Sequence, residues 1–153
     1  MEIRIASAND IDGWMVLVRS AVADFPGMDM AEHRKTVLDF MRRSEAVCAA
    51  ESGKIAGGLL FSAEDGALCF LAVDPNFRRR HIAEKMLRFT LGFMNPERDV
   101  FVTTYREDAP EGAAARAFYK RIGFAEGRLY EEFGCPVQEF VLPHCKIPEN
   151  AAK

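Results

Sequence analysis

The stretch FLAVDPNFRRRHIAEKML, residues 70–87, joins an apolar segment to a helical pattern through a Pro-Asn turn and three consecutive arginines. Its apolar start, within residues 67–73, predicts a central β-strand covered on both faces. Apolar side chains at 82, 86, 89 and 93 predict a helix over about residues 82–94. The arginines therefore precede a helix N-terminus, where unpaired N–H groups and the helix dipole favour an anion. Arginine adds forked donors that suit phosphate.

The pattern on either side of this stretch predicts one domain. Strands are expected at 2–6, 46–52, 54–63, 67–73, 99–105, 128–133 and 137–142, and helices at about 11–25, 29–43, 82–94 and 113–122. This order, βααβββαβαββ, predicts an α/β (α+β) fold with a mixed, mostly antiparallel central sheet flanked by helices. We expect the domain to span residues 1–145 and a C-terminal tail to span 146–153.

Composition narrows the class of protein. The chain has 153 residues, 49% of them hydrophobic, and a net charge of −3, which argues against a general nucleic-acid binder. It shows neither a signal-peptide pattern nor a membrane-spanning run, so we expect a cytoplasmic protein with no membrane partner. The four cysteines lack Cys-x-x-Cys spacing, no metal site is expected, and three of the thiols are expected to be buried and reduced.

The arginine stretch resembles the acetyl-CoA loop of the GNAT superfamily of N-acetyltransferases. In that family a strand leads through Val-x-Pro-x-(Tyr/Phe) into Arg/Gln-x-x-Gly-x-Gly/Ala and a helix; the matching residues are Val73, Pro75, Phe77, Arg78, Ile82, Ala83 and Leu87. A second stretch, GAAARAFYKRIGF at 112–124, is similar to the family's Asn-x-x-Ala-x-x-(Leu/Phe)-Tyr-x-x-x-Gly-Phe; the matches are Ala115, Phe118, Tyr119, Gly123 and Phe124. Both motifs occur in the family's order, so the resemblance covers nearly the whole chain.

Two positions depart from the family pattern. His81 stands where the phosphate loop has its first glycine, and we expect a right-handed helical φ there, which histidine tolerates. Gly112 replaces the usual asparagine, a position that only assists cofactor contacts in the family.

The resemblance implies a site for acetyl-CoA and a role for each matching residue. The implied cofactor-binding residues are Leu71, Ala72, Val73, Arg78, Arg79, Arg80, His81, Ile82, Ala83, Glu84, Gly112, Ala115, Phe118 and Tyr119. Backbone N–H groups of 71–73 would polarise the thioester carbonyl. Tyr119 would be the general acid, because a phenol with a pKa near 10 can protonate a thiolate of similar basicity.

The proton acceptor and the amine site are less defined. The family's glutamate in the strand before the loop is absent from residues 66–70, so Glu107, with Asp108 beside it, is the nearest substitute, and ordered water is the alternative. The fold implies an acceptor site near Asp24, Phe25 and Asp29, whose acids, with Glu32, Glu131 and Glu132, suit a cationic amine. A small amine, an amino acid, a peptide N-terminus and an aminoglycoside all remain open.

The sequence predicts an N-acetyltransferase and leaves two alternatives. The first is a non-catalytic acyl-CoA-binding sensor or interaction module of the same fold, suggested by His81 and the absent glutamate. The second, ranked last, is a nucleic-acid-binding domain that uses the three arginines, although interleaved exposed aromatic residues are missing. The last hairpin, with EFVL at 139–142, is a candidate surface for a homodimer.

Overall fold

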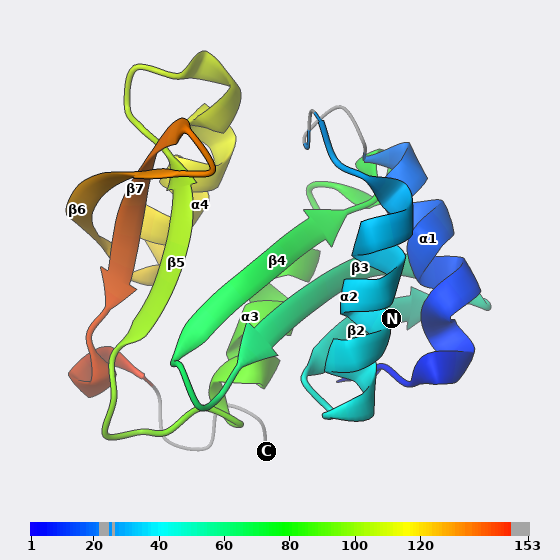
Figure 1. Cartoon of the computed structure of the whole chain (residues 1–153). Helices are drawn as coiled ribbons and strands as arrows, with labels where there is room; N and C mark the ends of the chain where they lie inside the picture. The colour runs from blue at the N-terminus through cyan, green and yellow to red at the C-terminus, as the bar shows by residue number, and fades with distance from the viewer. Residues whose placement is uncertain (22–24, 26, 148–153) are drawn as a thin grey trace.

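The computed structural model describes residues 1–21, 25 and 27–147 (Figure 1). Its strands are β1 (Glu2–Ile5), β2 (Ala46–Glu51), β3 (Lys54–Ser62), β4 (Ala67–Val73), β5 (Val100–Tyr105), β6 (Ala125–Glu132) and β7 (Cys135–Leu142). Its α-helices are α1 (Ile11–Ser20), α2 (Met30–Arg42), α3 (Ile82–Leu91) and α4 (Ala113–Ile122). Short 3₁₀ turns are η1 (Ala8–Asp10), η3 (Pro75–Phe77), η4 (Pro110–Gly112) and η5 (His144–Lys146). The predicted order of helices and strands is confirmed.

The strands form one seven-stranded sheet in the order β1-β2-β3-β4-β5-β7-β6. Every neighbouring pair is antiparallel except β4 and β5, which are parallel because α3 crosses over between them. The predicted mixed, mostly antiparallel sheet is therefore confirmed. Helices α1 and α2 lie on one face of the sheet, and α3 and α4 lie on the other (Figure 1).

Each face of the sheet has its own hydrophobic core. Trp14, Val18 and Val37 of α1 and α2 pack against β2 and β3 on one face, and Phe70 of β4 packs against this cluster. Met86 and Leu87 of α3 pack with Phe140 of β7 in the other core. The side chain of β4 residue 70 and that of residue 71 therefore belong to opposite faces, as strand alternation requires.

β4 leaves β5 soon after the two strands meet. Only Ala67 and Leu68 pair with β5, opposite Phe101 and Val102. Against β3, Leu60 pairs with Phe70 and Phe61 pairs with Leu68, so Cys69 is an extra residue that makes a β-bulge. A bulge bends its strand and increases the local twist. The bend therefore coincides with the point where β4 and β5 diverge (Figure 1).

Several sequence-based expectations are wrong in detail. α1 ends at Ser20 instead of extending to residue 25, and α3 ends at Leu91, which leaves Phe93 43% exposed. β4 is not buried throughout, because Cys69 is exposed and only Leu68 and Ala72 are buried. Only Cys48 is a buried thiol, while the other three cysteines are exposed in the bulge, the last hairpin and η5. β7, the EFVL strand, is paired on both sides, so β6 is the free edge of that hairpin.

The last described residue belongs to the folded domain. Ile147, placed in the tail by sequence, packs against the core beside α3 and α4. None of the helices in the described ranges is long and apolar enough to cross a lipid bilayer.

A buried arginine fixes α4 on the β5–β7–β6 half of the sheet. Arg116, 5% exposed, donates from Nη1 to the Tyr105 carbonyl (2.9 Å) and to Gln138 Oε1 (2.7 Å), and from Nη2 to Glu126 Oε1 (2.8 Å). Because α4 carries Tyr119 one turn later, this arginine also positions the tyrosine.

Replacing Arg116 with methionine should lower the free energy of unfolding by about 3 kcal/mol, because two buried acceptors lose a charged donor. Urea denaturation checks this value. Arg121→Met, which removes an exposed arginine from the same helix, is the matched control and should change stability by less than about 0.5 kcal/mol. Equal effects of the two substitutions would contradict the anchoring role of Arg116.

Candidate functional site

A groove of about 780 Å³ lies between the outer part of β4 and helices α3 and α4. Its lining residues, which define the groove below, are Leu71, Val73, Phe77, Arg78, Arg79, His81, Ile82, Ala83, Glu84, Ala114, Ala115, Phe118, Tyr119 and Arg121. The surface has cations where α3 begins and apolar side chains along β4 and α4. A long ligand with an anionic end and an apolar arm fits this distribution.

The loop before α3 is held by a buried carboxylate. Asp74 Oδ1 accepts a hydrogen bond from the Asn76 backbone N–H at 2.8 Å, and Lys54 Nζ lies 3.4 Å from its Oδ2. Asp74 also begins η3, with Pro75 in its first turn. The loop therefore leaves β4 in a fixed direction and delivers the arginines to the N-terminus of α3.

His81 is the N-cap of α3 and has φ +58°, ψ +28°, which is left-handed. The expected right-handed φ is wrong here: the position that the family fills with glycine keeps the glycine conformation although it carries a side chain. Arg79 also has a positive φ, of +66°. Left-handed residues among ordinary ones can turn backbone N–H groups toward one concavity, so the backbone of this loop is compatible with an anionic ligand.

The three arginines do not share one position. Arg78 and Arg79 line the groove, whereas Arg80 turns away from it. Arg80 makes a two-pronged pair with Glu51 of β2, at 2.9 and 3.1 Å, and its guanidinium lies 5.4 Å from the Phe77 ring centroid. Arg80 therefore ties the loop to the sheet, and the predicted phosphate contact falls to its two neighbours.

Tyr119 is a buried residue that lines the groove. Its side chain is 6% exposed, and burial raises the pKa of its phenol to about 12. No hydrogen bond involves its hydroxyl, and the described part of the chain contains no buried side-chain polar atom without a partner. The hydroxyl is therefore the part of Tyr119 that reaches the groove. A neutral phenol that faces a groove can donate a proton or a hydrogen bond to a ligand.

The strand side of the groove offers backbone groups. Leu71 and Val73 line it, while Ala72 between them is buried and is not among the lining residues. Because the ladder to β5 stops at Leu68, no described strand pairs on that side with the amides and carbonyls of β4 beyond the bulge. An extended ligand can pair with such an edge as an added strand.

The other predicted residues lie elsewhere. Gly112 is buried against Tyr105, whose Cβ would lie 2.3 Å from an added Cβ, so glycine is needed there for packing. Glu107 and Asp108 are exposed after β5 and do not line the groove. Asp29 accepts from the Glu32 backbone N–H as the N-cap of α2, and Asp24 lies outside the described residues.

Two lining residues of the groove, Ala114 and Arg121, were not predicted from the sequence, although both share the helical spacing of Ala115 and Phe118.

An aromatic cluster, formed by Trp14, Phe25, His33 and Phe70, lies on the opposite face of the sheet. The Phe70 ring is 4.9 Å from that of Phe25 and 4.7 Å from that of His33. Trp14 Nε1 donates to His33 Nε2 at 3.2 Å. Burial lowers the pKa of His33, so its imidazole is neutral. This cluster was not expected from sequence, because its members come from α1, α2, the segment between them and β4.

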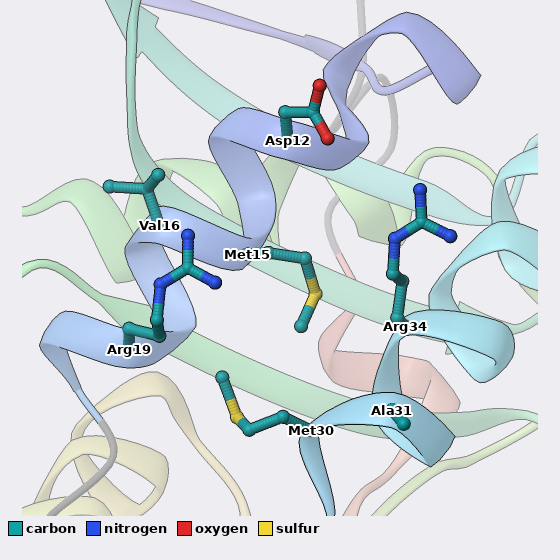
Figure 2. Close-up of a pocket in the computed structure, with 7 residues that line it drawn as sticks. All are labelled: Asp12, Met15, Val16, Arg19, Met30, Ala31 and Arg34. Atoms are coloured by element: carbon teal, nitrogen blue, oxygen red, sulfur yellow. The ribbon is translucent and has the colours of Figure 1, made fainter.

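A second hollow of about 420 Å³ lies between α1 and α2 and shares no lining residue with the groove. Met15 and Met30 lie at its centre, and Arg19, Arg34 and Asp12 lie around it (Figure 2). The described residues contain no group of three His, Cys, Asp or Glu side chains that could hold a metal ion.

Comparisons with known proteins agree with this geometry. The model of the acetyltransferase (GNAT) domain matches residues 42–126. A GNAT-family acetyltransferase from Streptococcus agalactiae is similar in structure, with a TM-score of 0.74, 18% identity and coverage of 97% of this chain and 96% of that one. One from Bacillus cereus has a TM-score of 0.71 and 22% identity, covering 92% and 94%. A GNAT-like decarboxylase in complex with isobutyryl-CoA has a TM-score of 0.72 and 15% identity, covering 94% and 100%. No curated protein sequence matches the chain significantly.

Replacing His81 with glycine should raise the free energy of unfolding by about 1 kcal/mol, because glycine adopts a left-handed φ without a Cβ clash. His81→Ala keeps the Cβ and is the control, expected to be no more stable than the wild type. Urea denaturation of the wild type and the two variants gives the order of their free energies of unfolding. A glycine variant less stable than the alanine variant would contradict the left-handed conformation.

The neutral His33 should make stability depend on pH. Because its pKa is lower in the folded protein than in the unfolded chain, its contribution is present above the unfolded pKa of about 6.5 and is lost as pH falls through the folded pKa. His33→Gln keeps an acceptor for Trp14 but does not titrate. Between pH 7 and 5 the free energy of unfolding should fall more for the wild type than for this variant, and parallel curves would contradict the assignment.

Proposed function

Because the chain belongs to the GNAT family of acetyltransferases, we propose that it is an acyl-CoA-dependent N-acyltransferase. In this proposal it moves an acetyl group from acetyl-CoA to a primary amine by direct attack in a ternary complex. The observation that carries it is that one groove is lined both by Arg78, Arg79 and the left-handed His81 and by Tyr119. The outer part of β4 lines the same groove through Leu71 and Val73.

The proposed cofactor contacts follow the groove. The pyrophosphate lies at the N-terminus of α3, against Arg78, Arg79 and the backbone from His81 to Glu84. Glu84 is compatible with this anion because its carboxylate is paired with Arg88 at 3.1 Å. The pantetheine arm pairs with the backbone of residues 71–73 and packs against Ala115 and Phe118. Arg80 and Gly112 support the loop and α4 without touching the ligand.

The proposed reaction needs three groups. The amine nitrogen forms a bond to the thioester carbon, and backbone N–H groups of β4 stabilise the oxyanion that develops. The C–S bond then breaks, and Tyr119 gives its proton to the leaving thiolate. Burial raises the pKa of this phenol to about 12, so the phenol holds its proton at neutral pH but is a weaker acid than the phenol of pKa near 10 expected from the sequence. The amine's proton leaves to ordered water, because Glu107 is exposed outside the groove and would act only through water.

The alternative function is a non-catalytic acyl-CoA-binding module. Two observations favour it: β4 carries no carboxylate, and His81 retains a strained conformation in the loop. It predicts cofactor binding without turnover. The structurally similar GNAT-like decarboxylase also shows why the fold alone does not select the reaction.

Tyr119→Phe should lower kcat for acetyl transfer about 100-fold, because a general acid contributes on this order. The affinity for acetyl-CoA should change less than about 3-fold, because the ring that packs in the groove is kept. Steady-state assays with a panel of amines and calorimetric titration measure the two quantities. Tyr130→Phe is the control, since its hydroxyl contacts Thr103 outside the groove. A wild-type kcat in Tyr119→Phe would contradict the acid role, and cofactor binding without any turnover of the wild type would select the alternative.

A further inference from the structure

Phe70 and Leu71 are adjacent residues on opposite faces of β4, just beyond the bulge. Leu71 lines the groove, and Phe70 packs with the helices of the other face. β5 no longer covers this part of β4. A thioester held along Leu71 would have Phe70 and the helices α1 and α2 on the other face of the same strand. A molecule that approaches from that face meets the aromatic cluster of Trp14, Phe25, His33 and Phe70.

The hydrogen bond from Trp14 determines which nitrogen of His33 carries the proton. An indole N–H can only donate, so His33 Nε2, 3.2 Å away, must be the bare nitrogen. The neutral imidazole therefore carries its hydrogen on Nδ1. Protonating Nε2 would place two N–H groups against each other in a buried position. His33 is thus held as a donor and is a poor base while the Trp14 bond exists.

The Nδ1–H group of His33 is open to a ligand. It has no hydrogen-bond partner among the residues that the structure describes. Those residues leave no buried side-chain nitrogen or oxygen without a partner, so Nδ1 must reach solvent although His33 as a whole is 9% exposed. A single accessible N–H on a ring that lies 4.7 Å from the Phe70 ring is a directional contact in an apolar setting.

We propose that His33 Nδ1–H binds an oxygen atom of the molecule to be acylated. The acceptor would be an amine that carries a carbonyl or carboxylate oxygen on an aromatic or apolar framework. This inference rests on the proposed acyl transfer and names the substrate class of the same site. Polyamines do not fit, because fully protonated amines offer no hydrogen-bond acceptor to an N–H donor.

The first test is the tautomer of His33 in the whole protein. Long-range ¹H–¹⁵N NMR spectra at neutral pH should show a protonated Nδ1 and a bare Nε2. Trp14→Phe should release this restriction and raise the population of the Nε2–H form, while His144, exposed and far along the chain, serves as the internal reference. A wild-type His33 with its proton on Nε2, or a charged His33 at neutral pH, would overturn the inference.

The second test uses two amines that differ by one carboxamide, phenylalaninamide and 2-phenylethylamine. The ratio of their kcat/KM values should fall about tenfold when His33 is replaced by phenylalanine, which keeps the ring and removes the donor. His33→Gln, which can still donate, should restore most of the ratio. The two amines differ in basicity, but that difference is the same for each protein and cancels. An unchanged ratio in His33→Phe would overturn the inference.

The role of His33 can be tested even if the proposed acyl transfer is not observed. If acetyl-CoA binds but neither amine is acylated, the proposed transfer to these amines is contradicted. Binding of each amine to the protein loaded with acetyl-CoA is then measured by NMR titration. Tighter binding of phenylalaninamide that is lost in His33→Phe supports the donor role without catalysis. Equal binding of both amines to the wild type overturns it.

Discussion

The parting of β4 from β5 is the constraint on which the rest of the molecule depends. The two strands share two residue pairs, and the bulge at Cys69 then bends β4 away. If β4 and β5 stayed paired along their whole length, the backbone groups of residues 70–73 would be bonded to β5 and could not contact a ligand. The divergence instead leaves a strand edge inside the domain that no described strand pairs with, which is tolerated because Leu71 and Val73 line a groove that water can enter.

The groove and the aromatic cluster are built by different means. On the side of α3 and α4, the groove depends mainly on backbone conformation. Residues 79 and 81 are left-handed, and the Arg80–Glu51 pair holds the loop that contains them. On the side of α1 and α2, the aromatic cluster depends on side-chain contacts, since the indole of Trp14 fixes the tautomer of His33. The proposed cofactor needs a general anion and strand-edge site, while the proposed acceptor is selected by one directional donor.

The sequence predicted the features that repeat locally. The order of strands and helices, the loop in front of α3 and the placement of Tyr119 follow from periodicity and two motifs. What it could not predict depends on distant partners. Arg80 looked like its neighbours until Glu51, which is 29 residues away in sequence, was placed beside it. His33 looked like an isolated histidine because Trp14 and Phe70 meet it only in the fold. The φ of His81 was mispredicted because local sterics favour a right-handed residue, whereas the loop requires a left-handed one.

The central claim is that the divergence of β4 and β5 makes a working acyl-CoA site. Calorimetric titration of the protein with acetyl-CoA, alongside acetyl-pantetheine as the same thioester without the pyrophosphate, tests it most directly. The account predicts micromolar binding of acetyl-CoA and binding of acetyl-pantetheine weaker by about 100-fold, since the charged contacts at the start of α3 are lost. Absence of acetyl-CoA binding up to millimolar concentration, or equal affinity for both ligands, would contradict it.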